Sequence, residues 1–335
     1  MVNRSNFALL FAIVLVSLIV AFSNDSFFNN ANILNLTRQI AMIGIFCIGI
    51  SFVIISGGID LSIGSMIGLT GVIIAKTTIP EPIGLEWPLW AGIITALFVA
   101  ILFGFFQGCL ISLLGLQPFI VTLGGMLLLR GISQTICKGG SLSLGNSPLR
   151  DLTDTGFNIG FIYIQYPIVI FIFITFICAI LLHFTSYGRY IYAIGGNKQA
   201  AFFSGVPIKH CEISVYIMSA TFAAISGILY CSYAGRISHN LGVAYELIGI
   251  AACVLGGCSL RGGGGTIIGV ALGACMMKII DNGINLFKVD FIDNSGRLSY
   301  WRLDTNWREI IFGIIILVAV LIDNTIQKNK KNINN

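Results

Sequence analysis

Residues 40–75 read IAMIGIFCIGISFVIISGGIDLSIGSMIGLTGVIIA, a long apolar run that is broken near its middle. The break is Ser56-Gly57-Gly58-Ile59-Asp60-Leu61-Ser62-Ile63-Gly64, which combines glycines with a carboxylate. Non-helical backbone at membrane depth is tolerated only where protein or a water-filled cavity satisfies its polar groups. The run therefore predicts a helix that is interrupted inside a membrane, and broken helices are a common way to build a transport pathway.

A second break of the same kind lies near the end of the chain. Gly256-Gly257-Cys258-Ser259-Leu260-Arg261 and the four glycines 262–265 separate two further apolar segments. Both breaks read Gly-Gly-x-[Asp/Ser]-Leu-x-x-Gly, a weak internal similarity that is compatible with two related bundles in one chain. The glycines are not followed by Lys and Ser/Thr, so they do not form a Walker motif for ATP. We expect a close backbone crossing there, and any ATP-driven step would need another subunit.

The composition of the chain indicates that most of it lies in lipid. Of its 335 residues, 56% are hydrophobic and 10% are charged, with a mean hydropathy of +0.92. Soluble domains carry about 25% charged residues. The net charge of +5 comes from scattered basic residues, so a nucleic-acid partner is not expected. Nine cysteines, mostly within apolar runs, act as small hydrophobic residues, and we expect no metal site and no cofactor.

Apolar segments of about the length of a membrane crossing recur along the whole chain. The first resembles a secretory signal, but it leads into further membrane segments, so we expect it to stay uncleaved. We predict an all-α polytopic membrane protein with about ten transmembrane helices, some of them broken or short, in a single domain over 1–335. The segments are Phe7–Phe22, Ile33–Ile55, Leu61–Thr78, Leu89–Leu113, Pro118–Ile136, Pro167–Phe184, Ile213–Tyr233, Tyr245–Leu255, Thr266–Phe287 and Glu309–Ile322.

Basic residues predict the orientation of the chain in the membrane. The loop 185–211 carries Arg189, Lys198 and Lys209 without an acidic residue between Thr185 and Cys211, and the tail 324–335 is also basic. Basic loops lie preferentially on the cytoplasmic side. With ten crossings, this loop and both termini fall on that side. The segment 288–308 then lies outside the cell membrane.

Ionisable residues inside apolar segments are the first candidates for function. Asp60 precedes a helix start, where it could accept backbone N–H groups as a cap, or it could contact a substrate path; both roles can hold. Lys278 and Asp281 lie three residues apart on one helix face and are expected to form a structural pair. Glu246 lies in a first helical turn, where acids are favoured by the helix dipole.

The segment 188–207 is basic, contains small residues and lies between two strong apolar segments. Asn197 can cap a short helix over Gln199–Ser204, with Gly205 as its stop. Such a short helix suits docking in a groove on a partner. From the residues alone, an ordinary solvated loop is an equally good interpretation.

Catalytic motifs are lacking. No Ser-His-Asp order, no G-x-S-x-G and no H-E-x-x-H occurs, and the three histidines are far apart without partners at ligand spacing. We therefore do not expect an enzyme.

Several segments, in order along nearly the whole chain, resemble the permease subunits of bacterial ABC importers for monosaccharides, the ribose, xylose, galactose and arabinose group. Each motif is weak alone, but together they are specific. The matching stretches are Gly57–Ser65, Pro118–Gly124 with Leu129-Arg130-Gly131, Ala193-Ile194-Gly195-Gly196-Asn197 with Ala200-Ala201, and Tyr245-Glu246-Leu247 through Ala251–Gly257 to Gly265-Thr266.

The resemblance implies a permease of about ten spans that works by alternating access in the plasma (inner) membrane. It implies three partners: a second permease copy, an extracytoplasmic sugar-binding protein and a separate ATPase subunit. It also implies that the loop with Asn197 is the coupling helix that touches the ATPase. The residues expected to couple to the ATPase are Gly196, Asn197, Lys198, Ala200, Ala201 and Gly205, and those expected along the translocation path are Asp60, Ser62, Thr122 and Ser259.

The chain departs from the pattern of this family at three places. Lys198-Gln199 stands where Pro-Glu is common, which puts an acidic contact with the ATPase in doubt. Cys258 stands where Thr or Ser is usual, and Lys288–Asn306 is longer than the usual link, either as a contact for the binding protein or as a plain surface insertion. Two other transporter classes stay open: a branched-chain amino-acid permease of the same general pattern, and a stand-alone ion-coupled carrier.

Overall fold

The fold comes from a computed structural model that describes residues 4–145, 147–160, 162–292, 298–302, 307–315, 317, 318 and 321. It is an all-α polytopic membrane protein. Within these residues, seven helices are long and apolar enough to cross a membrane, and two shorter apolar helices accompany them. The seven are α1 (Arg4–Ser23), α2 (Asn30–Ile55), α4 (Leu89–Ser112), α5 (Pro118–Cys137), α7 (Tyr166–Phe184), α10 (Ile208–Ala234) and α12 (Ile267–Leu286).

The remaining elements are short. The two shorter apolar helices are α3 (Ile63–Thr78) and α11 (Tyr245–Leu255). The connections contain η1 (Asp25–Phe28), η2 (Pro148–Arg150), α6 (Asp151–Asp154), α8 (Ser186–Gly196) and α9 (Lys198–Phe203). Three antiparallel pairs of strands complete the fold: β1 (Ser141–Ser143) with β4 (Arg236–Ser238), β2 (Gly156–Ile159) with β3 (Ile162–Gln165), and β5 (Lys288–Ile292) with β6 (Leu298–Arg302).

Helix α2 forms the centre of the bundle. From Ala41 to Ile55 every residue is buried, which explains why this stretch is apolar on all sides rather than amphipathic. Helix α10 packs against α2, α3 and α4, and α12 packs against α2, α11 and α1. By contrast, α1 and α4 expose large apolar side chains on their outer faces, where lipid or another subunit can cover them.

Local signals in the sequence determine where several helices begin. The Asn29 side chain accepts a hydrogen bond from Ala31 N at the start of α2, and Thr266 accepts one from Gly269 N at the start of α12. Proline occupies the first turn of α5 and of α7. Its missing N–H is no loss there, because the first N–H groups of a helix have no intrahelical partner.

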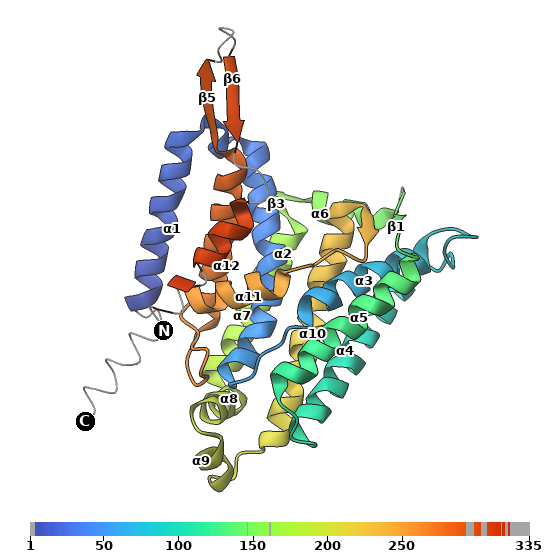
Figure 1. Ribbon diagram of the computed structural model, residues 1–335, viewed down its shortest axis with the longest axis vertical. Coiled ribbons are helices and arrows are strands. Elements are labelled where there is room, and N and C mark those ends of the chain that lie inside the picture. The colour runs from blue at the N-terminus through green and yellow to red at the C-terminus, as the bar shows by residue number, and fades with distance from the viewer. Residues whose placement is uncertain are drawn as a thin grey trace.

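The two ends of the bundle carry different structures (Figure 1). Helices α8 and α9 lie at one end, and the strands β1, β5 and β6 with α6 lie at the other. Helix α1 runs from the side nearer α8 and α9 toward the side of β5 and β6. The strands β5 and β6 thus lie at the end opposite α8 and α9. Which end faces the cytoplasm stays a prediction.

Most of the expected segments are confirmed. Within the described residues, nine of them are helices, with ends that differ by a few residues from the predicted bounds. The tenth, Glu309–Ile322, is described only in part, and its residues 309–315 are helical. The basic tail 324–335 lies outside the described residues. Both breaks are real: residues 56–62 separate α2 from α3, and 256–266 separate α11 from α12.

Candidate functional site

The first interruption folds around the carboxylate of Asp60, which is fully buried. Asp60 Oδ1 accepts hydrogen bonds from Ser62 N at 2.9 Å and from Ser62 Oγ at 2.7 Å. Asp60 Oδ2 accepts one from Ser219 Oγ of α10 at 2.7 Å. A buried carboxylate without partners is strongly unfavourable. These three bonds satisfy the buried carboxylate. Asp60 is not the cap of α3, because the N-cap residue is Ser62 and no side chain caps this helix; Asp60 instead accepts the N–H of Ser62 in the turn before it.

Helices α4 and α5 complete this polar cluster. Gln107 Oε1 lies 3.1 Å from Ser62 Oγ, and Gln107 Nε2 is buried with no hydrogen-bond partner among the described residues. Thr122 Oγ1 donates to Pro118 O at 2.9 Å and lies 3.4 Å from Ile59 O. A serine hydroxyl has one proton, so Ser62 can donate either to Asp60 or to Gln107.

Three of the four residues expected along the translocation path therefore meet at one place. Asp60, Ser62 and Thr122 are brought together, and all three side chains are closed off from solvent in this conformation. Ser259 lies elsewhere, in the second interruption, where its carbonyl accepts from Gly262 N and its N–H donates to Gly264 O, both at 3.0 Å. Their contact with a substrate stays a prediction.

The segment expected to couple to a partner has the predicted local structure. Helix α9 begins after Asn197, whose Oδ1 accepts from Ala200 N at 3.0 Å. It ends before Gly205, which has a φ of +78°, a conformation that glycine adopts readily. Ala200 is exposed and Ala201 is buried, so only the first can touch a partner without a change in the fold.

Helix α9 also carries a salt bridge to the bundle and two exposed aromatic side chains. Lys198 Nζ pairs with Glu212 Oε1 of α10 at 2.5 Å, which ties α9 to the bundle. Phe202 and Phe203 are 66% and 86% exposed, with ring centroids 5.8 Å apart. Two exposed phenylalanines on a short helix beyond the membrane-spanning helices are suited to a protein groove. The sequence analysis did not single them out, although they directly follow Ala200-Ala201.

A cleft of about 430 Å³ is lined by residues 56–58 of the first interruption, by residues 194–198 at the end of α8 and the start of α9, and by residues 115–118 up to the start of α5. Its polar lining includes Gln117, Lys198, Glu212, Tyr216 and Arg261. Tyr216 Oη lies 3.5 Å from Ile59 O, next to Asp60. The interruption is thus sheltered by protein on one side and faces a polar cleft on the other, as non-helical backbone at membrane depth requires.

A second charged site, which the sequence analysis missed in part, lies against α3. Arg130 of α5 donates to the carbonyls of His239 and Leu241, the latter at 2.9 Å. Glu246 Oε2 is buried with no hydrogen-bond partner among the described residues. Arg130 lies over Gly68 and Glu246 over Gly64, one turn apart on the same face of α3. An arginine inside an apolar segment was the available signal for this site.

The expected pair on α12 is confirmed. Lys278 Nζ lies 2.5 Å from Asp281 Oδ2, and both side chains are nearly buried. Asp281 Oδ1 also lies 3.7 Å from Arg308 Nη1. The contact with Arg308 links α12 to the segment after β6. This arrangement fits a structural role.

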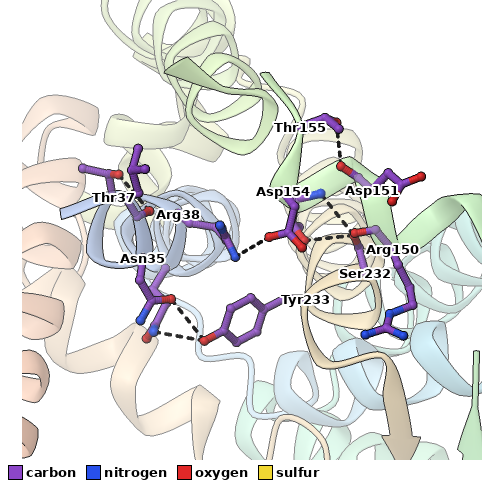
Figure 2. Close-up of polar contacts among 12 residues, drawn as sticks. Asn35, Thr37, Arg38, Arg150, Asp151, Asp154, Thr155, Ser232 and Tyr233 are labelled. Atoms are coloured by element: carbon purple, nitrogen blue, oxygen red, sulfur yellow. Dashed lines mark hydrogen bonds and ion pairs between the residues drawn. The ribbon is translucent and has the colours of Figure 1, made fainter. Parts of the chain in front are cut away.

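Polar contacts hold the opposite end of the bundle together (Figure 2). Arg38 of α2 pairs with Asp154 of α6 at 2.7 Å, and its guanidinium lies 5.6 Å from the centroid of the Tyr233 ring. Tyr233 Oη donates to Asn35 Oδ1 at 3.2 Å, and Ser232 Oγ donates to Leu149 O at 2.5 Å. These bonds join α2, α10 and the connection between α5 and α7 into one cap.

Known proteins resemble the chain over nearly all of its length. The family described as branched-chain amino acid transport system / permease component matches residues 32–320. The ribose import permease protein RbsC of Haemophilus influenzae is 36% identical over 98% of this chain and 94% of its own length. No solved structure matches the chain.

Ribose and xylose permeases of other bacteria also match the chain. The ribose import permease protein RbsC of Bacillus subtilis is 35% identical over 91% of this chain and 88% of its own length. The xylose transport system permease protein XylH of Escherichia coli is 30% identical over 97% and 93%. The family expected from the sequence is thereby confirmed.

Proposed function

This chain belongs to the family of branched-chain amino acid transport system permease components, and from that premise we propose that it is the translocating subunit of an ATP-driven monosaccharide importer. The similarity to ribose import permeases over 98% of the chain carries this proposal. A pentose of the ribose or xylose type is the proposed substrate, because both kinds of relative match. The subunit is a multi-pass protein of the bacterial inner membrane.

The proposed mechanism is alternating access without covalent chemistry on this chain. A loaded sugar-binding protein docks at the end with β5 and β6. A separate ATPase binds at the opposite end and moves α8 and α9. Two copies of the permease enclose the path between them. The polar lining of such a path needs to bind a sugar only weakly, since the sugar must also leave.

Helix α9 is the proposed contact with the ATPase. Its exposed residues, above all Phe202 and Phe203, would insert into a groove of that subunit, while the Asn197 cap and the buried Ala201 hold the helix in shape. Gly196 and Gly205 delimit the segment, and Lys198 holds it against Glu212. This proposal puts α8, α9 and the start of α1 on the cytoplasmic side, in agreement with Arg189, Lys198 and Lys209.

For Asp60, Ser62 and Thr122 we propose support of the interrupted helix, with substrate contact only after the path opens. Their hydrogen bonds are made within one subunit and leave no exposed surface. Ser259 is proposed to keep the second interruption in its turn. The path would then be shaped by the backbone that these side chains hold.

A substrate comparison tests the proposed function. The complex of this chain with its ATPase and binding protein is reconstituted in proteoliposomes, and ATP hydrolysis is measured with D-ribose, D-xylose or L-leucine. We expect stimulation by one of the two pentoses and none by leucine. Stimulation by leucine alone would instead favour a branched-chain amino-acid importer, the printed description of the family.

A further inference from the structure

Three segments that are far apart in the sequence meet backbone to backbone near the end with α8. Gly195 at the end of α8 touches both interruptions: a Cβ added to it would lie 1.9 Å from Ile55 O and 2.4 Å from Gly263 N. A Cβ on Gly262 would lie 2.9 Å from the Cα atoms of both Gly57 and Gly195. Only a hydrogen atom fits at these contacts, so α8 and the two interruptions are in direct backbone contact.

Hydrogen bonds lock this glycine junction, which we define as Gly57, Gly195, Gly262 and Gly263. Gly263 N donates to Ile55 O at 2.8 Å and so ties the second interruption to the last turn of α2. Tyr192 Oη donates to Gly265 O at 2.7 Å. Burial raises the pKa of Tyr192 to about 12, so this hydroxyl keeps its proton at physiological pH.

Tyr192 and Gly195 lie three residues apart in α8 and therefore on one face of that helix. A second tyrosine of α8 points elsewhere: Tyr187 Oη lies 2.7 Å from Ser214 Oγ of α10. One anchor thus holds α8 to the long helix α10, and the other holds it to the second interruption. The two hydroxyls have different partners and can therefore be removed separately.

We propose that Tyr192 and Gly195 are positioning residues that pass a movement of α8 and α9 to both membrane interruptions at the same time. The inference rests on the proposed function, because it assumes that an ATPase moves this segment. Direct backbone contact leaves no intervening side chain to rotate and absorb a small displacement. Packed contacts of this kind shift between discrete arrangements rather than deform gradually.

A pair of matched tyrosine variants tests this inference in the full complex with the ATPase and binding protein. Tyr192→Phe removes only the hydroxyl that reaches Gly265 O and, at 3.4 Å, His183 Nδ1. Tyr187→Phe removes only the hydroxyl that reaches Ser214 Oγ and, at 3.6 Å, Met218 Sδ. D-ribose uptake and ATP hydrolysis are measured in the same proteoliposomes. A single hydrogen bond contributes enough to change an equilibrium about five-fold. We expect Tyr192→Phe to lower the uptake per ATP hydrolysed by about that factor, with Tyr187→Phe close to wild type.

Two helical glycines provide a second matched pair. Gly195→Ala places a methyl group against Ile55 O, whereas a Cβ on Gly131 of α5 meets nothing within 4 Å. We expect Gly195→Ala to uncouple hydrolysis from uptake and Gly131→Ala to leave both unchanged. If Gly195→Ala does not assemble with the ATPase, Tyr192→Phe decides the matter, because it removes a single oxygen atom.

The outcomes separate this inference from the proposed function. A wild-type complex that takes up ribose, with equal uptake per ATP in both tyrosine variants, overturns the inference and leaves the function intact. An equal loss in both variants also overturns it, since a general weakening of α8 would then explain the result. A wild-type complex that neither hydrolyses ATP in response to sugar nor takes sugar up overturns the proposed function and the inference with it.

Discussion

The hydrogen bonds of Asp60 stabilise the first interruption. Its two carboxylate oxygens satisfy Ser62 N, Ser62 Oγ and Ser219 Oγ, and all of these atoms are buried. Loss of one partner of a buried hydrogen bond leaves the other unsatisfied, which is more unfavourable than loss of both. The side chain therefore connects the turn before α3 to α10.

Substitutions of Asp60 separate support from substrate contact. Asp60→Asn keeps an oxygen for Ser62 N and an amide group that can donate to Ser219. Asp60→Ala keeps neither and should lower the free energy of unfolding by about 1–3 kcal/mol. Unfolding of the purified protein in detergent measures the difference. Wild-type stability of Asp60→Ala would contradict the supporting role, whereas an Asp60→Asn variant with wild-type stability but no sugar uptake would show that the carboxylate also acts in transport.

The sequence predicted only the local half of this cluster. Asp60 and Ser62 are two positions apart, so a turn with a carboxylate acceptor could be expected. Ser219 and Gln107 are 159 and 45 residues away from their partners, and nothing local marks them as members of the cluster. Which distant side chains approach the turn depends on the packing of α4 and α10 against α3.

Among the elements, α9 has the clearest surface for a partner. Its last two residues are exposed phenylalanines at the end of the molecule, as Figure 1 shows for the position of the helix. Exposed apolar side chains beyond the membrane stabilise nothing within the subunit. They are therefore suitable for substitution without loss of the fold.

Phe203→Ala should weaken binding of the ATPase and leave the permease folded. Aromatic anchors of protein interfaces contribute about 2 kcal/mol or more, which corresponds to a loss of affinity of more than about ten-fold. Phe176→Ala, at an exposed position of the membrane-spanning helix α7, serves as the control. Co-purification of the ATPase measures the effect. Retention of the ATPase by Phe203→Ala at wild-type levels would mean that α9 is not its main contact.

Substitution of Gly64 in α3 tests how closely the elements pack around the first interruption. A Cβ on Gly64 would lie 2.3 Å from Gly242 O and from Glu246 Oε2, whereas one on Gly124 of α5 meets nothing within 4 Å. Gly64→Ala should destabilise the subunit by about 1–3 kcal/mol. Gly124→Ala should be neutral or slightly stabilising, because alanine favours a helix. Thermal unfolding compares the two variants. Equal stability would mean that α3 does not pack this closely against the segment before α11.

Long apolar helices were predictable because hydropathy over the width of a membrane needs no knowledge of neighbours. Helix α8 was not predicted as a helix, since residues 186–196 are short and mix aromatic, basic and glycine residues. The β1–β4 pair was missed because Ser141–Ser143 and Arg236–Ser238 are joined only in the folded chain. Helix α9 was predicted because Asn197 and Gly205 are local start and stop signals.

At the scale of the whole molecule, the chain has two different ends joined by buried helices. One end carries the strand pairs and the polar cap around Arg38 and Asp154. The other carries α8, α9 and the glycine junction, where both interruptions come together. In the proposed mechanism, the ATPase moves the end with α8 and α9, and this movement changes the backbone of both interruptions. Substrate would enter from the opposite end.

Directional uptake is the measurement that tests this proposal most directly. Proteoliposomes are prepared with the complex in one orientation, with the binding protein and D-ribose on the side of β5 and β6 and ATP on either side in turn. We predict uptake only when ATP is on the side of α8 and α9 and only when the ATPase subunit is present. Uptake without the ATPase that stops when an ion gradient is dissipated would contradict it and identify a stand-alone carrier.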